Sequence, residues 1–180
     1  MAEVTPQSAH AEKLAWFRHY FRPHFVDWVF NPIDRLVPSQ DALIGFIVMT
    51  CAIDCLAGFW WGTNTKNKVR DTYVKFIDEY FPPKQYDADG LYDSLRNGLV
   101  HMFTIKDKKH ALTHNQPHLH LKIATTGHTM LNAENFRDDL VLAREKYFDE
   151  VEANPELLDR LVERYSREGF LDIGGLELKG

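Results

Sequence analysis

The sequence predicts an all-α protein, one helical bundle over residues 1–180 with a small β-hairpin insertion at about 108–130. Three observations support this. Apolar residues recur at helical spacing over most of the chain, prolines or glycines separate the helical segments, and one short segment alternates polar and apolar residues with a period of two. With 180 residues, 44% of them hydrophobic, the chain is long enough for a single core.

The N-terminal segment is predicted to form an aromatic-rich helix. Ser8 is a good N-cap residue, and apolar residues follow at helical spacing up to Phe21. Pro23 should kink or end this helix, because proline lacks an N–H group and its ring crowds the preceding turn. We expect Asn31-Pro32 to close the aromatic continuation.

The segment from Ala42 to Trp61 follows Pro38-Ser39 and is apolar almost all round. It is long enough to span a bilayer, which takes about 20 apolar residues. Asp54 opposes this reading, since a carboxylate at the centre of a membrane helix costs about 2.5–3.5 kcal/mol on insertion scales. Gly45 and Gly58 suit close helix packing, so we expect the central helix of a bundle and no membrane contact.

A third helix is predicted from about Thr65 to Tyr80, where Pro82-Pro83 stops it. Asp87 or Asp89 should cap the helix that follows.

Two C-terminal helices are expected over about 132–168. The first starts at Asn132, and the second opens with Asn154-Pro155 and stops at Gly169, which is the usual order of cap, first-turn proline and terminal glycine.

Between these helices, the residues from His118 to Ile123 alternate polar and apolar, which is typical of a half-buried strand. The turn-forming residues 115–117 precede it. We therefore expect Lys109–Thr113 to be the other strand of a hairpin.

The most informative stretch runs from Leu91 to Phe103. On an ideal α-helical wheel one stripe is apolar and the opposite side carries polar side chains, with Arg96 and His101 at its two edges. The apolar stripe holds Leu91, Leu95, Gly98, Leu99 and Met102, and the other side holds Asp93, Arg96, Asn97, Val100 and His101. A phosphate-sized group facing the polar side would meet a fixed cation, an amide and a titratable imidazole together.

The segment Arg96-Asn97-Gly98-Leu99-Val100-His101 resembles the Arg-polar-x-x-x-His signature of the HEPN superfamily, which consists of small α-helical bundles. The resemblance covers roughly Ser39 to Phe103. It implies a metal-independent ribonuclease of the toxin or defence type, with a composite site where two motif helices meet in a homodimer. No cofactor is implied, and a cognate antitoxin is a candidate partner.

In that setting His101 would act as general acid or base, and Arg96 would stabilise the phosphate. Asn97 would orient the imidazole or the phosphate. The Asp54 carboxylate needs an ion-pair partner in so apolar a helix, and the Arg96 guanidinium is the candidate cation. Alternatively, Arg96 pairs with Asp54 or Asp93 for purely structural reasons, and the chain is a non-catalytic nucleotide-binding or protein-interaction module.

Other candidate groups are weaker. Lys106, Lys108 and Lys109 follow the motif helix and form a candidate rim for RNA, although a solvated loop explains them as well. No carboxylate or cysteine at ligand spacing accompanies the histidines of the insertion, so no metal site is predicted. The tryptophans lie among other apolar positions, which favours packing over base stacking; they are Trp16, Trp28, Trp60 and Trp61.

Charge and cysteine usage bound the function further. Of the 26 acidic residues, 13 lie from Glu134 onward, against 7 basic ones there, so the net charge of −5 belongs to the C-terminal helices. No broad basic surface is visible, which makes non-specific binding of duplex DNA an unfavoured function. Cys51 and Cys55 are expected to be reduced core thiols. With no signal-peptide pattern at Met1–His10, a cytoplasmic protein is expected.

Overall fold

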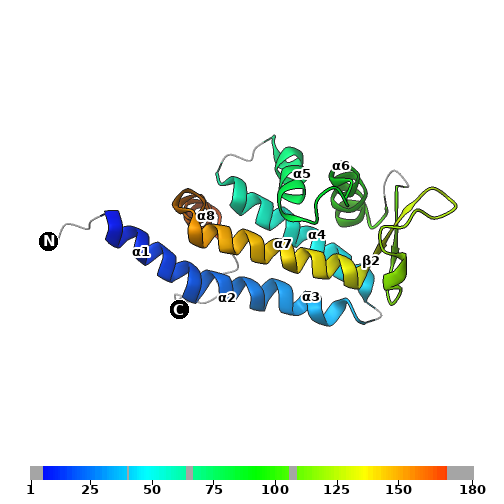
Figure 1. Ribbon diagram of the computed structural model, residues 1–180, viewed down its shortest axis with the longest axis horizontal. Coiled ribbons are helices and arrows are strands. Elements are labelled where there is room, and N and C mark those ends of the chain that lie inside the picture. Colours follow the sequence, from blue (N-terminus) through cyan, green and yellow to red (C-terminus); the bar gives the residue numbers. More distant parts are fainter. Residues whose placement is uncertain (1–5, 40, 64–66, 106–108, 170–180) are drawn as a thin grey trace, which may run out of the picture.

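The computed structural model describes residues 6–39, 41–63, 67–105 and 109–169 and is mostly helical. A long N-terminal arm, residues 6–36, runs beside α7 (Figure 1). Helix α4 lies next to α7, and α5 and α6 follow it on the side away from the arm (Figure 1). A small sheet lies at one end of the molecule (Figure 1). The described elements are α1 (Pro6–Trp16), η1 (Phe17–Phe21), α2 (Arg22–Phe25), η2 (Val26–Phe30), α3 (Asn31–Leu36), α4 (Ala42–Trp61), α5 (Val69–Tyr80), α6 (Ala88–Leu91), η3 (Tyr92–Val100), β1 (His110–Thr113), η5 (Pro117–Leu119), β2 (Thr129–Asn132), α7 (Ala133–Ala153) and α8 (Pro155–Glu168).

The helical path of the N-terminal arm continues past both prolines. The predicted end at Asn31-Pro32 was therefore wrong, and of the two alternatives predicted for Pro23, a kink or an end, the end is excluded. Its α-helical pieces are joined by two π-helical turns, η1 and η2, each placed just before a proline, Pro23 or Pro32. The N–H of Arg22 donates to the carbonyl of Phe17, and that of Asn31 donates to Val26, five residues back in each case. We infer that the wider turn gives each proline ring room beside the preceding carbonyls, so that the helical path continues.

Aromatic side chains hold the arm on α7. Phe17, Phe21 and Phe25 are all buried, and each of their rings lies within 6.2 Å, between centroids, of the Phe148 ring. Edge-to-face packing of this kind adds to the burial of apolar area. The arm is therefore part of the main core.

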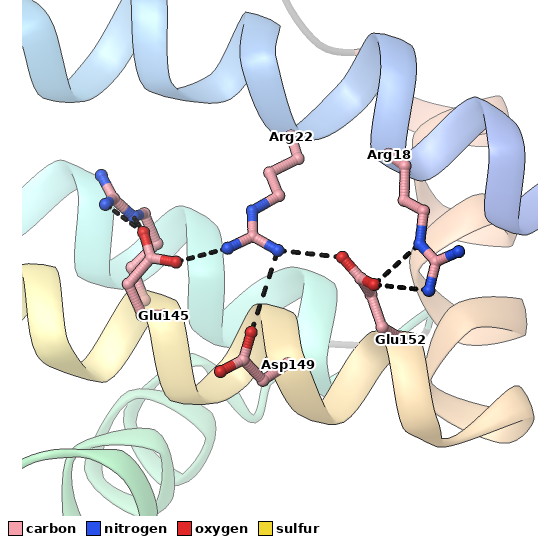
Figure 2. Close-up of polar contacts among 6 residues, drawn as sticks. Arg18, Arg22, Glu145, Asp149 and Glu152 are labelled. Carbon is pink, nitrogen blue, oxygen red and sulfur yellow. Dashed lines mark hydrogen bonds and ion pairs between the residues drawn. The ribbon is translucent and has the colours of Figure 1, made fainter.

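A ladder of ion pairs borders this aromatic seam (Figure 2). The Arg22 guanidinium lies 2.5 Å from Glu145, 2.9 Å from Glu152 and 3.8 Å from Asp149, and Arg18 lies 2.7 Å from Glu152. Arg18 and Arg22 of the arm are thus paired with carboxylates of α7. The ladder is partly exposed, where isolated ion pairs contribute about 0–1 kcal/mol each.

Helix α4 packs against α3, α5, η3, α7 and α8, which makes it the central helix, as expected. Gly45 allows close approach, because a Cβ there would lie 3.2 Å from a methyl carbon of Val37. By length and composition α4 is the one helix among the described residues that could cross a membrane, and 61% of its most apolar window is buried inside the protein. Cys51 and Cys55 are free; Cys51 is exposed, so its assignment to the core was wrong.

The predicted helix limits in the second half of the chain are confirmed. Asn132 caps α7, accepting from the N–H of Asn135, and Asn154 caps α8, accepting from the N–H of Glu156. Helix α5 ends at Tyr80, just before the two prolines. Helix α5 begins at Val69, later than the predicted start at about Thr65, a residue that itself lies outside the described ones.

The insertion is not a β-hairpin. Strands β1 and β2 are parallel, with His110 opposite Thr129 and Thr113 opposite Asn132. The residues between them form the crossover that parallel strands need. Most of the segment expected as a strand, 118–123, turns through η5, and Leu121 takes a positive φ of 60°; Ile123 alone forms a bridge, to Thr129.

Candidate functional site

The motif helix is η3, which continues directly from α6. The Asp87 side chain caps α6 by accepting a hydrogen bond from the N–H of Gly90. Of the two predicted caps, Asp87 and Asp89, the first is therefore the one used. Beyond Leu91 the chain winds as a π-helix over nine residues. In a π-helix backbone hydrogen bonds join residues five apart, whereas residues five apart in an α-helix point about 140° from each other.

This winding brings Arg96 and His101 into contact. The Nη1 atom of Arg96 lies 2.7 Å from Nε2 of His101. Because a guanidinium only donates hydrogen bonds, Nε2 of the imidazole is the acceptor in this contact. The two residues that the wheel set at opposite edges of a face are therefore neighbours.

Asp54 of α4 holds the other side of the same guanidinium. Both Nε and Nη2 of Arg96 donate to Oδ2 of Asp54, each at 3.3 Å. The predicted pairing is confirmed as a contact. The Tyr92 ring adds a cation–π contact, with its centroid 5.7 Å from the Arg96 Cζ atom. Arg96 is thus fixed by residues of two helices.

The site is open to solvent on one side. His101 is exposed, and the side chains of Arg96 and Asp54 are 23% and 32% exposed. Beneath them Leu91, Leu95 and Leu99 are buried, as the wheel predicts. Met102 was also expected inside, but it is 59% exposed, because the wider winding shifts the later residues around the axis.

The Asn97 side chain hydrogen-bonds Asp93, which is also bound by two nitrogens of Arg70 at 2.7 and 2.9 Å. The predicted role of Asn97, to orient the imidazole or the phosphate, stays a prediction. Arg70, chiefly through these hydrogen bonds, lowers the pKa of Asp93 below its usual value, and Asn97 adds to the effect. The Arg70–Asp93 pair also excludes Asp93 as the main partner of Arg96.

The predicted lysine rim is only partly described. Lys106 and Lys108 lie outside the described residues. Lys109 lies 3.5 Å from the Asp87 carboxylate, to which it is paired. Its charge is therefore partly compensated.

The histidines of the insertion do not gather at one point. His110 is buried and its Nδ1 lies 2.9 Å from the Ser94 hydroxyl of η3. His120 accepts at Nδ1 from the Asn132 N–H and bonds Tyr86 through Nε2. Over the part of the chain that the structure describes, no group of three His, Cys, Asp or Glu residues could hold a metal ion.

Sequence reasoning missed the arginines of α8. Arg164, together with Arg96 and Asp54, lines a pocket of about 110 Å³ beside the motif helix. Arg160 lines a second pocket of about 290 Å³ with Trp60 and Trp61. These tryptophans are half-buried, so the expectation of packing holds only in part. The spacing of Arg160 and Arg164, one turn apart, was the available signal.

No protein-family model, curated protein or solved structure matches the chain. The function therefore has to be argued from the geometry of the site itself.

Proposed function

We propose that this protein is a metal-independent endoribonuclease whose site is formed by Arg96 and His101. The observation that carries the proposal is the 2.7 Å contact between Arg96 Nη1 and His101 Nε2 at the exposed end of η3. An accessible imidazole nitrogen with a lone pair can accept a proton, and the adjacent guanidinium binds phosphate oxygens.

The chemistry follows from these two groups. His101 Nε2 takes the proton of a ribose 2′-hydroxyl, and the resulting oxyanion attacks the adjacent phosphorus. The bond from phosphorus to the 5′-oxygen breaks, leaving a cyclic phosphate and a 5′-hydroxyl. Arg96 exchanges its contact with His101 for one with the phosphate, whose charge grows in the transition state. The leaving oxygen needs an acid, which His101 of a second copy would supply.

Asp54 acts as a positioning residue in this scheme. Its carboxylate binds Nε and Nη2 of Arg96 and so leaves Nη1 directed at His101. Two hydrogen bonds to one carboxylate oxygen reduce the motion of the long side chain, and the guanidinium is then in place before substrate arrives.

A protein-interaction module is the alternative, and one observation favours it. Met102 and Phe103, at the end of the motif helix, are 59% and 70% exposed, and Leu43 and Ile44 of α4 are 48% and 41% exposed. Exposed apolar side chains of this size suit a protein contact. The enzyme proposal requires a second copy of the chain to bind this apolar surface, whereas an interaction module would bind an antitoxin-like protein there.

The test is cleavage of single-stranded RNA in EDTA by the wild type, Arg96→Ala and His101→Ala. We expect both variants to lose about 10²–10⁴-fold in rate, the usual worth of a general acid or base. His118→Ala is the matched control, because His118 is an exposed histidine away from the motif helix. Folded wild type that leaves RNA intact would refute the enzyme and favour the interaction module.

A further inference from the structure

The arginines of α8 lie directly over the backbone of α4. A Cβ atom on Gly58 would lie 2.8 Å from Cζ of Arg164, and one on Gly62 would lie 3.3 Å from Cβ of Arg160. A side chain at Gly58 would require the Arg164 guanidinium to shift, and one at Gly62 would crowd the stem of Arg160. The two arginines, one helical turn apart, are therefore seated side by side along the end of α4.

These arginines extend the motif site into two neighbouring pockets. Arg164 shares the smaller pocket with Arg96, and Gly58 forms part of its wall. Arg160 belongs to the larger pocket, whose other lining residues are Trp60 and Trp61. Arg96, Arg164 and Arg160 thus line a path that runs from His101 along the end of α4 to the indole rings of Trp60 and Trp61.

The second pocket combines π-surface with positive charge. The rings of Trp60 and Trp61 are 6.0 Å apart between centroids, and the Nζ atoms of Lys68 and Lys75 lie 5.6 and 5.2 Å from the centre of the Trp61 ring. The Trp60 ring packs edge-to-face against the rings of Phe76 and Tyr80. The pocket is therefore supported by aromatic packing on the Trp60 side.

Among the residues that the structure describes, this path has more cations than carboxylates paired with them. Its cations are Arg96, Arg164, Arg160, Lys68 and Lys75. The carboxylates paired with them are Asp54, at 3.3 Å from Arg96, Glu168, at 2.8 Å from Arg164, and Glu156, at 3.7 Å from Arg160. An anionic chain that carries planar rings is complementary to this arrangement.

We propose that the path from His101 to the Trp60–Trp61 pocket binds a single-stranded nucleic acid, with phosphates on Arg96, Arg164 and Arg160 and one base in the pocket. The proposal rests on the proposed function and names its substrate class. Bases of a duplex are stacked and paired, so only a single strand offers a base to the indole rings.

Binding is measured by fluorescence anisotropy of a labelled single-stranded oligoribonucleotide in EDTA, with His101→Ala as the parent so that no cleavage intervenes. We expect Trp61→Leu and Arg160→Gln each to weaken binding about tenfold or more, since stacking on an aromatic ring is a major term for single strands. Trp61→Phe should retain most of the affinity, because it keeps a ring.

The controls are Trp28→Leu and Arg167→Gln, which remove an exposed tryptophan of the N-terminal arm and an exposed arginine of α8. Both should bind like the parent. Thermal melting of each variant checks its folding. If Trp61→Leu and Arg160→Gln bind like the parent while folded, or if duplex RNA binds as tightly as the single strand, the proposal is overturned.

The two proposals can fail separately. If the wild type leaves RNA intact but binds it in a way that depends on Trp61, the ribonuclease is refuted and the nucleic-acid path is kept. If the wild type cleaves RNA and the KM of Trp61→Leu and Arg160→Gln equals that of the wild type, the ribonuclease is kept and the path is refuted.

Discussion

The N-terminal arm and the motif helix both display arginines, yet the two regions use them differently. Arg22 of the arm meets three carboxylates of α7, and Arg18 shares one of them (Figure 2). Arg96 of the motif helix meets one carboxylate at 3.3 Å and turns its remaining nitrogen to an imidazole. Arg22 thus directs its donors at carboxylates, whereas the proposed function requires Arg96, paired with the single carboxylate of Asp54, to exchange its Nη1 contact for a phosphate.

The two regions are also held in place by different forces. The arm is attached through the buried rings of Phe17, Phe21 and Phe25 against Phe148. The motif helix has leucines beneath it and, in addition, a buried polar pair, Ser94 with His110. We therefore expect the arm to respond mainly to loss of apolar volume and the motif helix to respond to pH.

The largest expected effect is in the arm. Phe148→Ala should lower the free energy of unfolding by about 3–5 kcal/mol, because it removes a fully buried ring and leaves a cavity among three others. Glu152→Gln should cost about 1 kcal/mol or less, since it only weakens two partly exposed ion pairs, with Arg18 and Arg22. Urea unfolding followed by circular dichroism measures both. Equal losses would show that the ion ladder holds the arm as strongly as the aromatic seam does.

The same conservative substitution distinguishes the two kinds of arginine. Arg96→Lys should reduce the RNA cleavage rate by about 10²–10³-fold, because a lysine cannot bridge Asp54 and His101 while also presenting donors to a phosphate. Arg22→Lys should leave the rate unchanged. Single-turnover cleavage assays provide the comparison, and a similar loss in both variants would point to a global effect on folding.

The buried Ser94–His110 pair makes a pH-dependent contribution. Burial, the largest cause, lowers the pKa of His110 below its usual value near 6.5. Between the folded and unfolded pKa values the unfolded chain binds more protons, so the stabilisation is complete above about pH 6.5 and is lost as the pH falls through the lowered value. Ser94→Ala, which leaves Nδ1 without its partner, should cost about 1–3 kcal/mol at pH 8.

Unfolding curves at pH 8 and pH 5 check this expectation. His110→Phe should flatten the pH dependence relative to wild type, whereas His118→Ala, at an exposed position, should not. An unchanged slope in His110→Phe would mean that other groups carry the pH dependence.

The smallest effect concerns the end of the motif helix. Phe103 has a φ of 51°, which is unfavourable for any residue with a Cβ atom, and it is 70% exposed. Phe103→Gly should therefore raise the free energy of unfolding by up to about 1 kcal/mol, while Met102→Gly, at a helical position, should lower it by about the same amount.

Sedimentation of the same two variants tests the proposed dimer. If Phe103 contacts a second copy, Phe103→Gly should weaken self-association although it stabilises the monomer. A variant that is more stable and equally associated would remove Phe103 from the interface.

Local signals in the sequence determined most of the helices. Asn132, Asn154-Pro155 and Pro82-Pro83 set helix limits through capping and loss of an N–H donor, which depend on neighbouring residues alone. The leucines of the motif helix and the Asp54–Arg96 contact were also predictable, because a carboxylate in an apolar helix requires a partner.

Tertiary structure decided the rest. A wheel of fixed pitch cannot anticipate the π-helical winding that joins Arg96 to His101, or the π-turns that carry the arm past its prolines. The parallel pairing of β1 with β2 and the seating of Arg164 over Gly58 are contacts between residues far apart in the chain. Periodicity and capping report only on neighbours within a turn or two, so contacts of this kind are settled only when the whole chain packs.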